Sequence, residues 1–397
     1  MEHLYLSASL WLSLALISAV LAYYLKVSIA LIEICVGVIA GYVASNFLHT
    51  DLLNNNEEWI KFLAGSGAIF LTFLAGAELE PTIMKAKWKE VLVVGLVGFF
   101  SPFIGCSLIA HFLLGWDLRA SLLCGVALST TSMAVVYAVM IDTGLNMTEY
   151  GKGILGSCFI NDIGTVLTLG IIFAPFTYKT FVFIAITLVY LVFFPFVTNY
   201  LTKVYGNRTA AIRTKWISFT LFGLGALALW SGNEAVLPAY IAGMALAEFS
   251  QRNHVWLRRL RTLTVGFLTP FYFLRAGTFV SIPALISAPI LVFILLGAKV
   301  ISKIFGLYPF ISRFRQGSNE RWYYTLMMST GLTFGTISAL FGYSKNIINT
   351  EQYSYIVIAV IGSAVIPTMI ASYLFTPKHL LPRKVHATSA THELSEE

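Results

Sequence analysis

Asp162 is an acidic residue inside an apolar run that is long enough to cross a lipid bilayer. The run covers residues 151–175 and is otherwise built almost entirely from apolar and small side chains. A carboxylate near the centre of such a helix costs at least about 2.5 kcal/mol on insertion scales, which favours a functional role. Its available chemistry is the binding of a proton or a cation. The alternative interpretation is a structural ion pair with a base inside the membrane.

Polar side chains near Asp162 in the sequence could complete a cation site. Asn161 carries a neutral amide that could supply an oxygen ligand or orient the carboxylate. Thr130, Thr131 and Ser132 interrupt the preceding apolar run, and hydroxyl oxygens are ligands of the kind that hard cations require. We therefore predict that protons and alkali cations (Na⁺, K⁺ or Li⁺) compete for Asp162 as their shared ligand.

Three basic residues, Arg275, Lys299 and Lys303, lie within apolar runs rather than in loops. A lysine side chain reaches past only a few residues, so Lys299 must face protein or a cavity. Lys303 lies one turn further along and could extend to the nearer membrane surface. For Arg275 we favour a structural role that joins helices. Its candidate partners are Glu78, Glu80, Glu33 and Asp162.

The composition indicates a polytopic membrane protein. Of the 397 residues, 57% are hydrophobic and 11% are charged, and the mean hydropathy is +0.78. The net charge of +7 does not indicate nucleic-acid binding, because most Lys and Arg residues occupy short loops. The four cysteines show no metal-binding or disulfide spacing. With no P-loop, nucleotide-binding glycine motif or catalytic triad in the sequence, we expect neither an enzyme nor a cofactor.

Hydropathy predicts thirteen membrane spans, and the distribution of basic residues supports this number. Nineteen Lys and Arg residues lie in the tail or in loops that follow odd-numbered spans, and four follow even-numbered spans. The positive-inside rule then predicts an integral protein of the plasma (inner) membrane, with its N-terminus outside and its C-terminus in the cytoplasm. The predicted spans are 4–24, 28–48, 58–78, 90–114, 118–142, 151–175, 179–203, 214–232, 235–250, 262–282, 286–310, 321–343 and 353–375.

The fifth and twelfth spans share a small, polar centre. The centre of the fifth is residues 128–132, and that of the twelfth is residues 329–336, which include Gly331, Thr333, Gly335 and Thr336. Helices interrupted at matching positions in two halves are typical of transporter substrate sites. An offset of seven spans, an odd number, predicts an inverted repeat. The alternative interpretation is that the small residues only permit close helix packing.

Several segments resemble the monovalent cation/proton antiporter family, which includes sodium/proton exchangers and potassium-efflux antiporters. They are LAGSGAIFLTFLAGAELEP (63–81), ALSTTSMAVV (127–136, like "LSxTSPAVV"), FINDIG (159–164), YIAGMALAE (240–248, like "FLAGLxLS") and FYFLRAG (271–277, like "FFxxxG"). The resemblance extends over most of residues 1–375. It implies an all-α membrane fold with two crossed, discontinuous helices, and a homodimer.

The resemblance also implies a division of the chain. We expect a dimerisation part (about 1–57 and 179–250), a core part (about 58–175 and 262–375) and a short cytoplasmic tail (376–397). The family carries a basic residue near its ion-binding aspartate, and Lys299 is our first candidate for it, ahead of Lys303. The chain departs from the family pattern where Met133 replaces a proline. It also lacks the fused nucleotide-binding domain of potassium-efflux relatives, so we expect no direct nucleotide or glutathione gating.

The predicted function is exchange of a monovalent cation for a proton by alternating access around Asp162. A single carboxylate would exchange one cation for one proton without net charge movement, unless Lys299 also titrates. The alternative function is a cation-coupled carrier of organic anions, like the bile-acid carriers, in which Arg275 and Lys299 would serve the anion. A channel or a sensor without transport is a third interpretation.

Overall fold

In the computed structural model, all regular secondary structure among the described residues is helical; these residues are 2–25, 28–48, 53, 55–77, 87–145, 148–173, 177–205, 212–233 and 235–381. Glu78, Glu80 and most of the predicted tail lie outside these residues. The helices are α1 (Glu2–Leu25), α2 (Ile29–Val43), α3 (Glu58–Ala77), α5 (Trp88–Leu108), α6 (Leu118–Ser129), α7 (Met133–Thr143), α8 (Glu149–Phe173), α9 (Tyr178–Tyr205), α10 (Ile212–Trp230), α11 (Val236–Ala245), α12 (Ala247–Arg252), α13 (His254–Leu263), α14 (Thr269–Thr278), α15 (Ile282–Ser287), α16 (Pro289–Phe314), α17 (Ser318–Met328), α18 (Thr333–Ser344) and α19 (Thr350–Leu374).

The predicted number of spans is confirmed for the described part of the chain. Eight helices are long and apolar enough to cross a membrane: α1, α2, α3, α5, α8, α9, α16 and α19. The other five spans consist of shorter or more polar helices: α6 with α7, α10, α11 with α12, α13 with α14, and α17 with α18. The π-helical turns η1 (Ala44–Leu48), η2 (Ile109–Leu113) and η4 (Thr264–Leu268) extend α2, α5 and α13.

Side-chain caps mark the starts of several helices. Asp117 accepts hydrogen bonds from the first turn of α6, and Ser28 does so for α2. Asn349 and Gln352 form a reciprocal capping box at the start of α19. These caps satisfy backbone N–H groups that have no partner within the helix. The first turns of these three helices are therefore specified locally.

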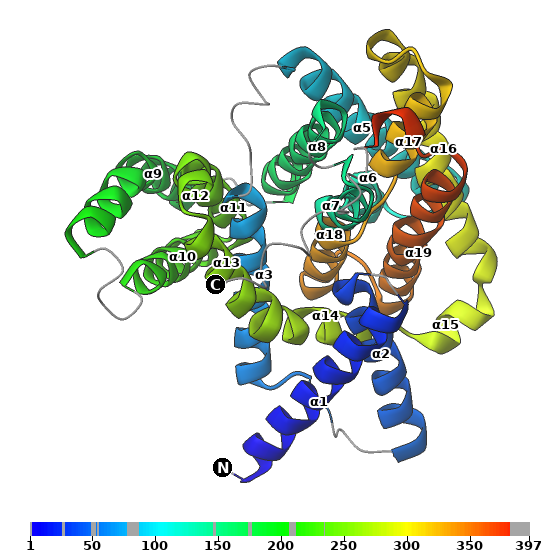
Figure 1. Cartoon of the computed structure of the whole chain (residues 1–397). Helices are drawn as coiled ribbons and strands as arrows, with labels where there is room; N and C mark the ends of the chain where they lie inside the picture. Colours follow the sequence, from blue (N-terminus) through cyan, green and yellow to red (C-terminus); the bar gives the residue numbers. More distant parts are fainter. Residues whose placement is uncertain are drawn as a thin grey trace, which may run out of the picture.

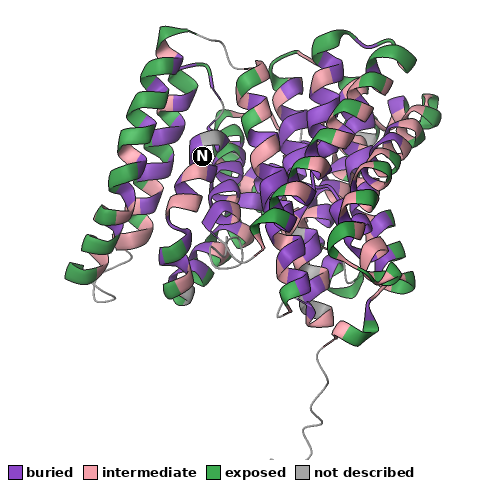
Figure 2. Ribbon diagram, turned by 90° about the horizontal axis from the view of Figure 1, so that it is seen from above, coloured by how far each residue is buried: buried purple, intermediate pink, exposed green. Residues whose placement is uncertain are grey.

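The helices pack into two groups. One, which we call the core bundle, contains α5–α8 and α16–α19, which contact one another extensively. The other, the flanking group, contains α1–α3 and α9–α14, with α2 against α14 and α3 against α11 and α14. In Figure 1, α9, α10, α12 and α13 lie on the opposite side of the molecule from α16 and α19. Buried residues concentrate where the helices meet, and exposed residues line the outermost helices (Figure 2).

Two close helix contacts in the flanking group repeat the same geometry. A Cβ atom on Gly37 or Gly277 would overlap the backbone of the facing helix, and so would one on Gly76 or Gly243. The first pair joins α2 to α14, which are the second and tenth spans. The second pair joins α11 to α3, the ninth and third spans. The two contacts are therefore related by the seven-span offset, which supports the inverted repeat.

Two helices are broken at the point where they cross. The fifth span changes from α6 to α7 through residues 130–132, and the twelfth from α17 to α18 through residues 329–332. The N–H group of Ser132 donates to the carbonyl of Thr330 at 3.1 Å, so the two unwound segments touch directly. The prediction of two crossed, discontinuous helices is confirmed. The half-helix ends lie inside protein, where their free backbone groups can be paired.

Candidate functional site

Asp162 lies on α8 beside the crossing of the broken helices. Its side chain is 1% exposed, and its Oδ1 atom has no hydrogen-bond partner among the described residues. Buried polar atoms are rarely left without a partner, and each exception calls for an explanation. A carboxylate oxygen held in this state is available for a proton or for a cation.

Asn161 holds the break between α6 and α7 in place. Its Oδ1 accepts a hydrogen bond from the N–H of Thr131 at 2.9 Å, and its Nδ2 donates to the carbonyl of Ser129 at 3.3 Å. The amide therefore pairs two backbone groups that the helix break leaves free. The sequence suggested that Asn161 would offer an oxygen to the ion or orient Asp162. In this conformation its oxygen already has a partner.

Lys303 and Lys299 approach the crossing from α16, and both side chains are 0% exposed. Lys303 Nζ donates to Thr131 Oγ1 at 2.7 Å and to the carbonyl of Met328 at 2.6 Å. Lys299 Nζ donates to the carbonyl of Thr130 at 3.1 Å. The expectation that Lys303 could reach the membrane surface is wrong, because it points into the protein. Lys303 also lies close enough to Asp162 for a charge on one to affect the other.

The two lysines place their amino groups at the ends of two half-helices. Met328 is the last residue of α17, and Thr130 follows the last residue of α6. Helix C-termini carry partial negative charge on their free carbonyl groups, and cations there are stabilising. The arrangement leaves Asp162 as the polar group at the crossing that has an oxygen still unpaired.

The hydroxyl groups of the unwound segment of the fifth span also have partners. Thr131 Oγ1 donates to the carbonyl of Met328 at 2.8 Å and accepts from Lys303. Ser132 Oγ accepts from the N–H of Val135 at 3.4 Å, and Thr130 Oγ1 donates to its own helix. Their oxygens keep a further lone pair, so they can serve as ligands only alongside these contacts.

The unwound segment of the twelfth span lets neighbouring side chains and helices approach it closely. A Cβ atom on Gly331 would overlap Lys299 Nζ, and one on Gly335 would lie about 3.0 Å from atoms of α6 and α19. Thr336 is fully buried and bonds to its own helix through the carbonyls of Leu332 and Thr333. These small residues therefore make room for Lys299 and α6.

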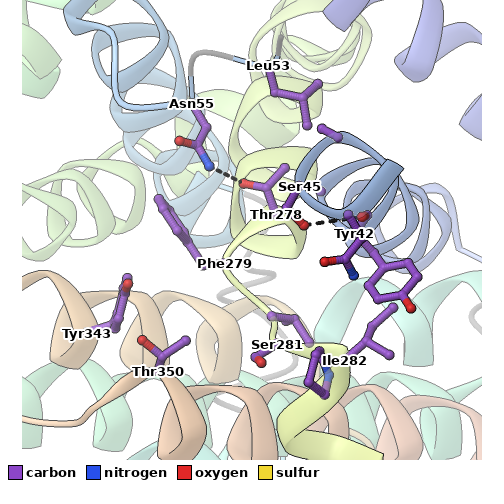
Figure 3. Close-up of a pocket in the computed structure, with 15 residues that line it drawn as sticks. Tyr42, Ser45, Leu53, Asn55, Thr278, Phe279, Ser281, Ile282, Tyr343 and Thr350 are labelled. Atoms are coloured by element: carbon purple, nitrogen blue, oxygen red, sulfur yellow. Dashed lines mark hydrogen bonds between the residues drawn. The ribbon is translucent and has the colours of Figure 1, made fainter. Parts of the chain in front are cut away.

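Arg275 does not reach Asp162. Its Nε donates to the carbonyl of Asn55 at 2.8 Å, and its guanidinium lies 4.8 Å from the centre of the Phe279 ring. Asn55 and Phe279 line a cavity of about 650 Å³ where α2 ends and α19 begins, which Figure 3 shows. Two of its predicted partners, Glu78 and Glu80, lie outside the described residues. The contacts of Arg275 fit a charge that joins helix ends.

Several buried groups could not be assigned from the sequence. Glu33, a candidate partner of Arg275, is 1% exposed, and its Oε2 has no partner among the described residues. Glu90 and Arg315 form an ion pair across α5 and α16, with N–O distances of 2.7 and 3.0 Å. Tyr240 of α11 donates to the carbonyl of Phe159 on α8 at 3.2 Å. The motif that contains Tyr240 (residues 240–248) indicated a membrane span, but nothing in that motif indicated this contact.

Comparisons with known proteins agree with this architecture. A family model described as "Sodium/hydrogen exchanger, transmembrane" matches residues 12–376. The chain is 28% identical over 253 residues to the "Probable Na(+)/H(+) antiporter 3" of Methanocaldococcus jannaschii, which covers 61% of this chain and 62% of that protein. It is 26% identical over 365 residues to the "Na(+)/H(+) antiporter" of Enterococcus hirae, covering 87% and 91%.

The fold also matches a solved structure. The sodium proton antiporter MjNhaP1 of Methanocaldococcus jannaschii at pH 8 superposes with a TM-score of 0.66 at 15% sequence identity. The match covers 94% of this chain and all of that one. At this identity, the likeness shows the fold. Together with the family model, which spans most of the chain, it shows that the chain belongs to the sodium/hydrogen exchanger transmembrane family.

Proposed function

We propose that this protein is a secondary transporter that exchanges a monovalent cation, Na⁺ or K⁺, for a proton, by alternating access around Asp162. The observation that carries the proposal is the unpaired, buried Oδ1 of Asp162 beside two broken helices. Membership of the family and the names of the relatives support Na⁺ and H⁺ as the ions. Because one carboxylate cannot hold both ions, competition between them couples their movements.

The proposed moving part is the core bundle, which carries Asp162, both broken helices and both lysines. We assign α3 and α14 to the flanking group because their extensive contacts are with α11, with α2 and with each other. This differs from the division suggested by the sequence, which grouped residues 58–78 and 262–282 with the core. A core that moves as one body keeps the hydrogen bonds of Asn161 and Lys303 intact during transport.

The replacement of Asp162 by Asn tests the proposal. We expect Asp162→Asn to reduce cation-dependent proton flux in proteoliposomes to the level of empty vesicles, because a neutral amide neither releases a proton nor binds a cation by charge. The assay should compare Na⁺, K⁺ and Li⁺. The matched control is Asp117→Asn, because Asn also caps a helix and Asp117 lies away from the crossing. Flux that survives in Asp162→Asn would remove Asp162 from the mechanism.

The same assay separates cation exchange from cation-coupled transport of organic anions. Proton flux that needs only an alkali cation supports exchange, and a requirement for an organic anion would support the alternative. That alternative relied on Arg275 and Lys299 to bind an anion. In the structure both bases donate to backbone carbonyls, those of Asn55 and Thr130, which favours cation exchange.

A further inference from the structure

Tyr240 connects the flanking group to the core bundle beside the candidate ion site. Its side chain is 1% exposed, and its hydroxyl donates to the backbone carbonyl of Phe159 at 3.2 Å. Phe159 precedes Asp162 by three residues on α8, about one helical turn.

The ring of Tyr240 packs between two parts of the core bundle. It stacks on Phe159 of α8 with ring centres 5.5 Å apart, and it meets Phe334 of α18 edge-on at 5.7 Å. Both phenylalanines are 2% exposed. Such aromatic pairs add stabilisation beyond the area that they bury. The three rings therefore form one contact between α11 of the flanking group and α8 and α18 of the core bundle.

The flanking group holds Tyr240 in a defined position. A Cβ atom on Gly76 of α3 would overlap the carbonyl oxygen of Tyr240, so the backbones of α3 and α11 are in contact at this residue. Elsewhere, α11 and α8 make few contacts. The backbone of Tyr240 is therefore fixed to the flanking group, while its hydroxyl is bonded to the core bundle.

The hydroxyl is not needed to fill space at this position. The family motif that residues 240–248 resemble begins with phenylalanine, which has the same ring without the oxygen. A helix carbonyl has a second lone pair, so Phe159 can accept from Tyr240 without giving up its own helical bond. The hydroxyl thus adds one hydrogen bond between the groups and little volume.

We propose that Tyr240 is a positioning residue that latches the core bundle in this conformation through its bond to the Phe159 carbonyl. This inference rests on the proposed function, because a latch matters only if the core moves. Movement of the core past α11 must break the hydrogen bond, while the bonds within the core remain. Tyr240 therefore sets the rate of exchange between conformations and leaves ion binding at Asp162 unchanged.

Replacement of the phenol by phenylalanine is the direct test. We expect Tyr240→Phe to raise the maximal rate of cation/proton exchange about fivefold, the rate equivalent of one net hydrogen bond. The apparent KM for the cation and the pH of half-maximal activity should not change. If Tyr240 had a purely structural role, its substitution would instead lower both thermal stability and activity.

Tyr190→Phe is the matched control. The hydroxyl of Tyr190 bonds to Thr220 Oγ1 at 2.9 Å inside the flanking group, so its loss removes a similar bond that does not cross between groups. An unchanged maximal rate in Tyr240→Phe, or an equal change in both variants, would overturn the latch. If the unmodified protein shows no cation-dependent proton flux, the proposed function fails. An active protein with an unresponsive Tyr240→Phe variant contradicts only the latch.

Tyr353→Phe tests whether the effect belongs to Tyr240. Tyr353 of α19 donates to the carbonyl of Ala276 on α14 at 2.7 Å, so it also joins the two groups, but its ring packs against Phe279 and Tyr343, which line the cavity. We expect Tyr240→Phe to raise the maximal rate more than Tyr353→Phe does, with no change in KM; an equal rise in both variants would show that the effect does not belong to Tyr240 and would overturn the latch. If Tyr240→Phe instead changes the apparent KM, Tyr240 acts on ion binding and the latch is wrong.

Discussion

At the scale of single residues, Asp162 is surrounded by polar groups that already have partners. Asn161 pairs two backbone groups of the broken fifth span, and Lys303 pairs Thr131 with the end of α17. Lys303 lies close enough to Asp162 for a charge on one to affect the other. An unpaired acid beside a positive charge can exchange ions without breaking the hydrogen bonds that hold the helix ends.

The distinct roles of the two lysines predict different energetic coupling to Asp162. Removing the charge of Lys303 should lower the free energy of unfolding by about 1 kcal/mol more when residue 162 is Asp than when it is Asn. For Lys299→Met the corresponding coupling should fall below about 0.5 kcal/mol, the level of independent sites. Unfolding of the four combinations for each lysine, measured in nanodiscs, gives both values. A larger coupling for Lys299 would restore it as the partner of Asp162.

At the scale of helices, the flanking group depends on backbone contacts that only glycine allows. Gly76 of α3 faces α11, and Gly243 of α11 faces α3, each without room for a Cβ atom. Gly37 and Gly277 repeat this contact between α2 and α14. Small residues at such contacts let helices approach closely in a membrane, where van der Waals packing drives association.

Two glycines on α3 should therefore respond in opposite ways to the same substitution. Gly76→Ala forces a Cβ atom into the backbone of α11 and should lower the free energy of unfolding by about 1–3 kcal/mol. Gly65→Ala meets no atom within 4 Å and should be neutral, or stabilising by up to about 1 kcal/mol through helix propensity. Thermal unfolding of both variants in one detergent provides the comparison. Equal melting temperatures would contradict the close contact of α3 with α11.

At the scale of the whole molecule, the core bundle gathers the charged groups of the site and the flanking group supports it. Asp162, Lys299 and Lys303 all belong to the core bundle. A body that carries these charges across the membrane field moves net charge according to their protonation. The number of charges moved in each cycle is thus a property of the assembled core.

One carboxylate that exchanges one cation for one proton predicts electroneutral transport. The exchange rate in proteoliposomes should then be the same with and without an imposed membrane potential, since no net charge crosses the bilayer. The measurement is the initial proton flux at a fixed cation gradient. The membrane potential should be set by an ion other than K⁺, because K⁺ is a candidate substrate. A rate that changes with voltage would mean that a further group, with Lys299 and Lys303 as the candidates, releases a proton in the cycle.

Much of the fold could be predicted because it depends on local composition. Apolar runs and the distribution of loop charges give the thirteen spans, and matching polar centres give the two broken helices. Asp162 was identifiable for the same reason, since a carboxylate in a membrane-length apolar run stands out without any knowledge of its neighbours. The division of the chain into two groups was harder to predict, because α3 and α14 have the hydropathy of any other span.

The sequence by itself determined which chemistry is present: the acid Asp162 and three basic residues, Arg275, Lys299 and Lys303, deep within spans, and two helices that must unwind in the membrane. Only the tertiary structure decided which of these groups meet. Lys299 and Lys303 lie one turn apart on the same face of α16, so the position of α16 along its axis determines which of them lies nearer to Asp162. Likewise, the partners of Asn161 and Tyr240 lie about 30 and 81 residues away in the chain, and packing alone brings them together.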